Sequence, residues 1–140
     1  MYDGTFMLHP QLSADTFPLG DWPLCRILRM NDCNFPWLIL VPRVENAREI
    51  IDLTEQDQQY LMTEIARASV ALKTLLKPDK LNVAALGNAV PQLHVHVIAR
   101  YKTDIAWPRP IWGVEPPLAF STMAATAELD RLRSAFGPFQ

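Results

Sequence analysis

The stretch QLHVHVIAR, residues 92–100, decides how this chain is interpreted. Its apolar and polar side chains alternate, and a period of two is typical of a β-strand because successive side chains point to opposite faces of the sheet. The apolar residues at positions 93, 95, 97 and 99 therefore share one face, and Gln92, His94 and His96 share the other. We expect the first face to pack and the second to carry chemistry.

Two of the 3 histidines of the chain lie on that second face. With a rise of about 3.3 Å per residue, the Cβ atoms of His94 and His96 are roughly 7 Å apart, so both imidazoles can act on one small group. Imidazole titrates at about pH 6.5, so one ring can attack as a neutral nucleophile while the other holds or delivers a proton. From spacing alone, exposed polar residues, a metal site and a catalytic pair all remain open. A metal site needs more ligands, and outside this strand only His9 is left among the histidines.

The segments before this strand predict a hairpin and a long helix. Residues 22–30 favour a strand, residues 31–36 form a turn, and the apolar run WLILVP at 37–42 is typical of a strand buried on both faces. Thr54 is a suitable N-cap, and apolar residues at positions 61, 65, 68, 72 and 75 make one helical stripe that ends before Pro78.

The remaining segments complete an α+β pattern. Residues 81–86 predict a further strand, and the proline-rich residues 101–117 predict an ordered loop held by Trp107 and Trp112. A short C-terminal helix follows from Ser121. Strands, helix, strands, loop and helix in this order favour an antiparallel sheet over a parallel one.

Composition limits the classes of function. The chain has 140 residues, 49% of them hydrophobic, and a net charge of −2 without a basic run, so we expect one globular domain and no polymeric nucleic acid partner. The first basic residue is Arg26 and the longest apolar run is short, so we expect neither a signal peptide nor a membrane span, and a cytoplasmic protein. Cys25 and Cys33 are too few for a disulfide scaffold, and we expect both to be buried thiols.

The motif QLHVHVI resembles the histidine triad signature of the HIT superfamily of nucleotidyl hydrolases and transferases, with Gln92 in place of the first histidine. The lead-in GNAVPQ is similar to that of the family, with Asn88 where the family has a glutamine. WLILVPR resembles the family strand that carries a Gly-His pair, and Trp37 stands in place of that pair. The resemblance spans roughly residues 23–100, and the remainder is more loosely similar to a bacterial branch.

The resemblance implies the fold and the domain organisation. We expect a HIT-like fold with an antiparallel sheet of about five strands, one long helix and a short C-terminal helix. Residues 1–140 would form a single domain, with a core at about residues 23–100 and a C-terminal extension at 101–140.

The resemblance also implies roles for individual residues. His94 attacks the α-phosphorus of a nucleotide, and His96 binds the phosphate and helps protonate the leaving group. Gln92 would replace a hydrogen bond of the missing histidine, but it cannot carry a proton. Asn88 and Asn82 would contact phosphate oxygens, although both also suit turn or strand-end roles. No metal or other cofactor is implied.

The nucleoside is expected on the first hairpin and near the tryptophans. Asn31 or Asp32 would bind the ribose hydroxyls, and an apolar base wall would come from Leu24, Ile27 and Leu28, all equally explained as hairpin core or turn residues. Trp107 and Trp112 would cap the nucleotide by stacking, or pack the loop.

The resemblance therefore implies a hydrolase or nucleotidyl transferase that cleaves a dinucleoside polyphosphate or a nucleoside phosphoramidate, and it implies a homodimer. Gln92 and Trp37 leave fewer imidazoles than the family has, unless His9 replaces one in space. A nucleotide-binding or sensing protein with little turnover is the alternative. A metal-binding protein that uses His94, His96 and His9 is the third hypothesis.

Overall fold

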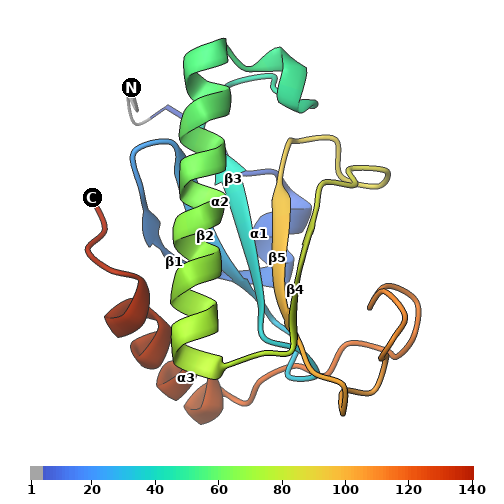
Figure 1. Ribbon diagram of the computed structural model, residues 1–140. Helices are drawn as coiled ribbons and strands as arrows, with labels where there is room; N and C mark the ends of the chain where they lie inside the picture. The colour runs from blue at the N-terminus through green and yellow to red at the C-terminus, as the bar shows by residue number, and fades with distance from the viewer. Residues whose placement is uncertain (1–4) are drawn as a thin grey trace.

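The computed structural model describes residues 5–140 and, within them, a five-stranded sheet in which every neighbouring pair is antiparallel (Figure 1). The order across the sheet is β1-β2-β3-β5-β4. The strands are β1 (Thr16–Asp21), β2 (Cys25–Met30), β3 (Trp37–Pro42), β4 (Lys80–Ala84) and β5 (Val95–Arg100). The predicted α+β class and antiparallel sheet are confirmed.

Helices cover both faces of this sheet. The long helix α2 (Glu55–Leu76) crosses the front face in Figure 1, with α3 (Thr122–Phe136) beside its lower end, and α1 (Pro10–Asp15) lies behind the sheet. A short 3-10 helix (Ile50–Asp52) precedes α2. The Thr54 hydroxyl accepts a hydrogen bond from the Asp57 amide, and Ser121 accepts one from Ala124, so both predicted helix starts are confirmed.

The first elements of the chain were not predicted. Residues 10–21 form α1 and then the edge strand β1, which pairs with β2 from Thr16 to Asp21 through a bulge near Gly20. Neither element is long enough for a clear hydrophobic period, so the pattern gave no signal. The hairpin of β2 and β3 is confirmed, although β2 begins at Cys25 rather than Trp22.

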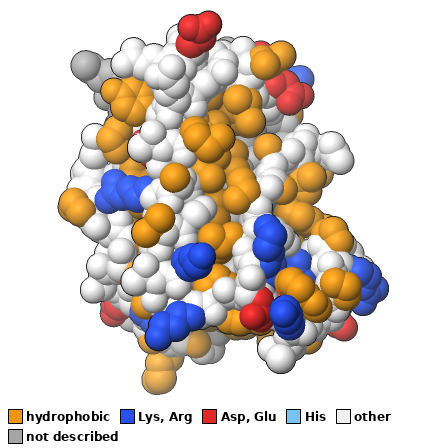
Figure 2. All heavy atoms as spheres, in the orientation of Figure 1, with side chains coloured by type: hydrophobic (Ala, Val, Ile, Leu, Met, Phe, Trp, Pro, Cys, Tyr) orange, Lys and Arg blue, Asp and Glu red, His pale blue; other side chains and the backbone are white. Residues whose placement is uncertain are grey.

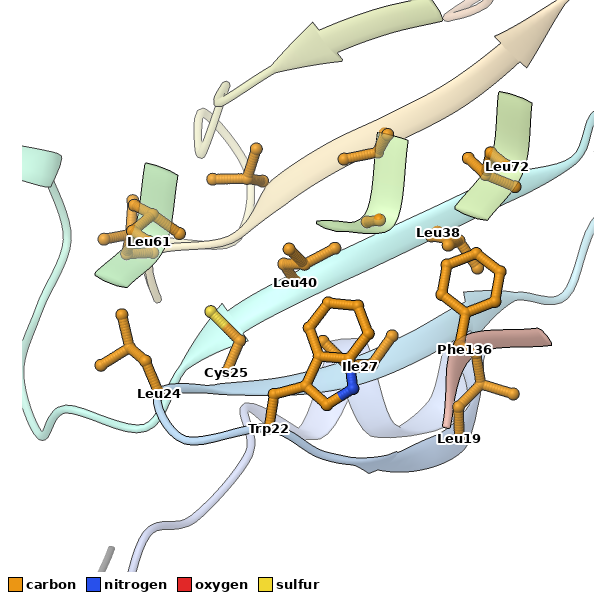
Figure 3. Packing of buried hydrophobic residues seen from close by; sticks show 14 of the residues in the cluster. Leu19, Trp22, Leu24, Cys25, Ile27, Leu38, Leu40, Leu61, Leu72 and Phe136 are labelled. Atoms are coloured by element: carbon orange, nitrogen blue, oxygen red, sulfur yellow. The ribbon is translucent and has the colours of Figure 1, made fainter. Parts of the chain in front are cut away.

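The face of the sheet toward α2 and α3 holds the larger apolar cluster (Figure 3). It combines residues of four strands with the apolar stripe of α2 and with the end of α3: Leu19, Ile27, Leu38, Leu40, Val95, Val97, Leu61, Leu72 and Phe136. The apolar row of β5 therefore packs here, as its period of two predicts. The other row of each strand faces the opposite side, where a second cluster contains Leu28, Trp37, Ile39 and Ile98.

One carboxylate interrupts the apolar stripe of α2. Glu64 is 3% exposed, and its two oxygens accept hydrogen bonds from the amides of Leu24 and Cys25, at 2.9 and 2.8 Å. These bonds join α2 to the start of β2. Burial, and then the nearby Glu64 carboxylate, raises the pKa of the Cys25 thiol well above its ordinary value. Cys33 is exposed, so the expectation that both thiols are buried is wrong for Cys33, which lies in the turn after β2.

Candidate functional site

The two imidazoles project from β5 and its approach onto the face opposite α2. His96 pairs with Ile39 of β3 and with Ala84 of β4 in the register of the sheet. The rings of His94 and His96 meet edge to face with centroids 5.0 Å apart. Both residues are buried, at 7% and 4% exposure. The prediction that the two rings share one face is confirmed.

His94 is held by the main chain of its own strand. Its Nδ1 lies 2.7 Å from the carbonyl oxygen of Gln92. A carbonyl oxygen can only accept, so this hydrogen bond requires the proton of the neutral ring to be on Nδ1. The lone pair is then on Nε2, at the far side of the ring. His94 therefore has the tautomer that a neutral nitrogen nucleophile needs.

His96 has the opposite tautomer, because an indole holds it. The Nε1–H of Trp37 donates to Nδ1 of His96 at 2.9 Å, and an indole N–H cannot accept. The proton of His96 is therefore on Nε2, which makes that atom a hydrogen-bond donor. Burial first, and then the neighbouring His94, lowers the pKa of His96 to about 4. The ring is neutral at physiological pH.

Aromatic side chains enclose His96. Trp112, in the loop after β5, packs edge-on against both His96 and Trp37, with ring centroids 5.1 and 6.1 Å away. Trp112 is 37% exposed, whereas Trp37 is 8% exposed. The Trp112 indole therefore covers part of the His96 ring.

Gln92 acts through its main chain rather than its side chain. Its Nε2 donates to the carbonyl oxygen of Met7, and its Oε1 accepts from the His9 amide. The side chain thus ties the N-terminal segment to β5, and within residues 5–140 it makes no hydrogen bond to either imidazole. This corrects the expectation that the Gln92 amide replaces the first histidine. His9 itself caps α1 by accepting from the Gln11 amide, and within those residues it makes no hydrogen bond or ring contact with the pair.

Asn31 and Asp32 line a cavity of about 210 Å³ that reaches Trp37. Asn31 Oδ1 accepts from the Phe120 amide, and Asp32 Oδ1 accepts from the amides of Asn34 and Leu118. The side-chain Nδ2 of Asn31 and Oδ2 of Asp32 make no hydrogen bond within residues 5–140, whereas the backbone amide of Asn31 donates to the Asp15 carbonyl oxygen. The other lining residues are Ala14, Asp15, Met30 and Pro117. Neither imidazole lines this cavity, but the indole that binds His96 does.

The other two predicted phosphate contacts, Asn82 and Asn88, lie on different elements. Asn82 is on the histidine face, but its Oδ1 accepts from Arg100, whose guanidinium also bonds to Asp104. Burial raises the pKa of Asp104, but the stronger combined effect of the Arg100 bond and local amides lowers it to about 2. Asn82 therefore orients Arg100 through Oδ1, and a contact of its side-chain NH2 group with a phosphate stays a prediction. Asn88 is exposed in the loop before Gln92, where it remains open to a ligand.

The proposed base wall is wrong for two of its three members. Leu24 and Ile27 belong to the cluster under α2, on the far side of the sheet from the imidazoles. Leu28 alone lies on the histidine face. The strand period of two separates Ile27 from Leu28, and the sequence did not show which of them shares the face of His94. Trp107 stacks near the Arg100 guanidinium, 5.6 Å from it, and so packs the loop.

The donor role of Trp37 was missed. The sequence predicted that this tryptophan removes an imidazole, whereas the structure gives its indole N–H to the one imidazole whose tautomer it then determines. The signal was present, since a buried tryptophan usually finds an acceptor for its N–H. The position of Trp37 near His96 could not be predicted, because it depends on the register of β3 and β5, in which Trp37 pairs with Ile98, two residues after His96.

Two further observations concern other kinds of site. Within residues 5–140, no group of three or more His, Cys, Asp and Glu side chains is arranged to hold a metal ion. In the same range, no helix has the length and apolarity to cross a membrane.

The chain is similar to known proteins over most of its length. The family model described as HIT domain matches residues 11–103. A histidine triad protein from Bradyrhizobium japonicum is 54% identical, with a TM-score of 0.90 over 94% of this chain and 98% of that one. One from Marinobacter aquaeolei is 47% identical, with a TM-score of 0.91 and coverage of 95% and 97%. One from Sinorhizobium meliloti is 39% identical, with a TM-score of 0.90 and coverage of 94% and 97%. A search of curated proteins found no match.

Proposed function

Because the chain belongs to the histidine triad (HIT) family, we propose that it is a hydrolase or nucleotidyl transferase that cleaves a nucleoside phosphate bond. The substrate is a dinucleoside polyphosphate or a nucleoside phosphoramidate, and the intermediate is a nucleotidyl group on His94. The observation that carries this proposal is the pair of opposite tautomers. His94 offers a lone pair at Nε2, and His96 offers an N–H at Nε2.

Each tautomer suits one part of phosphoryl chemistry. The His94 lone pair forms the bond to phosphorus, and the positive charge that develops on its ring is stabilised by the Gln92 carbonyl on Nδ1. The N–H of His96 donates to a non-bridging phosphate oxygen, where negative charge is concentrated. Both groups are aligned before a substrate arrives, because hydrogen bonds already orient both rings.

We assign the nucleoside to the cavity beside Trp37. The open Oδ2 of Asp32 accepts hydrogen bonds and the open amide of Asn31 donates them, which fits a pair of ribose hydroxyls. Its volume of about 210 Å³ is below the roughly 300–1,000 Å³ of pockets that enclose a whole drug-sized ligand, so it fits one ring system. The phosphate would then lie toward His94, with Asn88 at its outer side.

A second copy of the chain is the proposed partner. Strand β4 is an edge of the sheet, and Val70 of α2 is 66% exposed beside an apolar groove. Figure 2 shows hydrophobic side chains along the centre of this face, with Lys and Arg side chains mainly in its lower half. Light scattering on the purified protein measures its molar mass in solution. We expect the mass of two chains, and a monomeric mass would contradict the homodimer.

The experiment that tests the enzymatic proposal traps the intermediate. Adenosine and guanosine dinucleoside polyphosphates labelled at the α-phosphorus are mixed with the protein, and turnover is quenched with alkaline detergent, which preserves a phosphorus–nitrogen bond. We expect label on the peptide that contains His94, and none in His94→Asn. His9→Asn is the matched control, because asparagine keeps the helix cap and the control should label like the native chain.

A protein that binds nucleotides with little turnover is the second candidate. It is favoured by the Gln92 side chain, which faces the N-terminal segment, and by His96, which is neutral. Neither group then supplies a proton to a leaving group. Nucleotide binding without label, and without hydrolysis above that of His94→Asn, would establish this candidate and exclude the enzyme.

A further inference from the structure

The bond between Trp37 and His96 removes one chemical option from His96. An imidazole acts as an acid at neutral pH only when both ring nitrogens carry protons. Nδ1 of His96 accepts the indole N–H at 2.9 Å, and a proton on that nitrogen would direct one N–H against the other. Trp37 is 8% exposed and His96 is 4% exposed, so water does not readily replace the lost bond.

The groups that face His96 from neighbouring elements do not replace this acid. Directly before β5, His94 uses Nε2 for attack and holds its Nδ1–H on the Gln92 carbonyl. At the end of β5, Arg100 is bound to Asp104 and Asn82. An arginine does not release a proton in proteins. Opposite His96 stand Ile39 on β3 and Ala84 on β4.

The loop side of His96 is equally without an acid. Trp112 covers the ring there, and an indole has no acidic proton at neutral pH. Burial, followed by the influence of His94, lowers the pKa of His96 to about 4, which agrees with a ring that stays neutral. Among the described residues in contact with His96, the site therefore offers hydrogen bonds to the phosphate and no proton to the leaving group.

Resting on the proposed function, we propose that Trp37 is a positioning residue that determines specificity. By fixing His96 as a donor through Nε2, it limits the site to substrates whose leaving group departs as a weakly basic anion. The substrate class is then a nucleoside phosphoanhydride, such as a dinucleoside polyphosphate. Nucleoside phosphoramidates of aliphatic amines are excluded.

The bonds, electron pairs and protons in each step explain why the leaving group matters. The lone pair of His94 Nε2 forms the bond to phosphorus, and the bond from phosphorus to the leaving group breaks with its electron pair on the departing atom. A phosphate oxygen carries that pair as an anion, whereas an amine nitrogen must receive a proton as the bond breaks. Water then attacks phosphorus, the electron pair of the phosphorus–nitrogen bond returns to Nε2, and the surplus proton of the water leaves to solvent.

The test varies the leaving group at constant nucleotide. Dinitrophenyl, para-nitrophenyl and phenyl esters of AMP and of GMP present leaving groups of rising basicity. General-acid catalysis contributes about 10²–10⁴-fold, so we expect kcat/KM of the native chain to fall more than about 100-fold from the dinitrophenyl to the phenyl ester. Trp37→Phe keeps an aromatic ring but frees Nδ1 of His96. At about pH 5, where part of His96 can then be protonated, we expect this variant to recover about 10-fold on the phenyl ester.

The pH profile separates this role from a merely structural one. For Trp37→Phe, kcat/KM on the phenyl ester should rise as the pH falls from about 6.5 toward about 4, because Nδ1 of His96 is then free to take a proton, while burial and His94 still keep the pKa of the ring low. The native chain should lack that rise. Trp107→Phe is the matched control, since it makes the same change at an indole that packs on Arg100 instead of on His96. Its dependence on the leaving group should equal that of the native chain.

Each outcome decides between the two proposals. Equal kcat/KM on all three esters in the native chain would overturn the role of Trp37 and leave the proposed enzyme intact. The same would follow if a folded Trp37→Phe keeps the native dependence on the leaving group. The ester series on the native chain needs no variant, so a poorly folded Trp37→Phe does not block the decision. No turnover of any ester, together with no label on His94, would overturn the enzyme and this inference with it.

Discussion

The two faces of the sheet are built from the same strands and differ in what they contain. The face under α2 and α3 is mainly apolar, and its buried Glu64 and Arg29 are held by hydrogen bonds to the amides of Leu24 and Cys25 and by an ion pair with Glu128. The opposite face carries two imidazoles, an indole that binds one of them, and a loop instead of a long helix. Along β5, alternate side chains therefore pack in the core or face the candidate site.

Replacing His94 with alanine should have the largest effect, and it should act mainly on activity. Removal of a nucleophile that forms a covalent intermediate costs at least about 10⁴-fold in kcat. The free energy of unfolding should fall by only about 1 kcal/mol, because one hydrogen bond to the Gln92 carbonyl is lost. Steady-state kinetics and urea unfolding measure both. A large loss of stability with modest loss of activity would reverse the assignment of this face.

Truncation of two adjacent residues of β3 should separate the faces. Leu40 packs under α2, and Ile39 packs on the histidine face opposite His96, and both are fully buried. Each change to alanine should lower the free energy of unfolding by about 2–5 kcal/mol. Only Ile39→Ala should also lower kcat/KM in conditions where both variants are folded. Equal activity in the two variants would contradict this division of the sheet.

Acid should destabilise the fold through His96. Its pKa is about 4 in the folded chain and 6.5 ordinarily, so the unfolded chain binds the extra proton as the pH falls between these values. Stability is therefore retained above about pH 6.5 and lost toward pH 4, by up to about 3 kcal/mol.

Urea unfolding across this pH range measures the effect, and His96→Gln should flatten it. The loss due to Asp104, whose pKa falls from 3.8 to about 2, lies at lower pH and should remain in that variant. An unchanged slope between pH 6.5 and 4 in His96→Gln would show that His96 is not held neutral by the fold.

Glu64→Gln should have the smallest of these effects. The variant keeps the shape of the side chain but turns one acceptor into a donor that faces a backbone amide. We expect the free energy of unfolding to fall by about 2 kcal/mol. Activity should be unchanged, since Glu64 is on the face away from the imidazoles. Thermal unfolding with an activity assay checks both, and lost activity in a folded variant would indicate coupling across the sheet.

Most of the fold could be predicted from local patterns. The period of two in residues 92–100, the apolar stripe of α2 and the capping residues Thr54 and Ser121 are all local signals. The stripe and both caps are confirmed, and the strand is confirmed from Val95 to Arg100. The segment at residues 10–21 was missed because α1 and β1 are six residues each, too short for a clear period.

The site could be predicted only in part, because tertiary contacts decide the remainder. The alternation placed His94 and His96 together, but it could not show that the Gln92 side chain binds the segment at Met7, which is 85 positions away in the chain. Nor could it show that Oδ1 of Asn82 accepts a hydrogen bond from Arg100. The phase of β2 relative to β5 decides whether Ile27 or Leu28 faces the imidazoles, and that phase follows from pairing through β3 rather than from either strand alone.

Nitrogen NMR of the native chain with labelled histidine tests the pair of tautomers most directly, because protonated and unprotonated ring nitrogens have well-separated chemical shifts. At neutral pH, we expect His94 to carry its proton on Nδ1 and His96 to carry its proton on Nε2, with a coupling between Nδ1 of His96 and the indole N–H of Trp37. A doubly protonated His96, or the same tautomer on both rings, would contradict the division of labour between the two imidazoles.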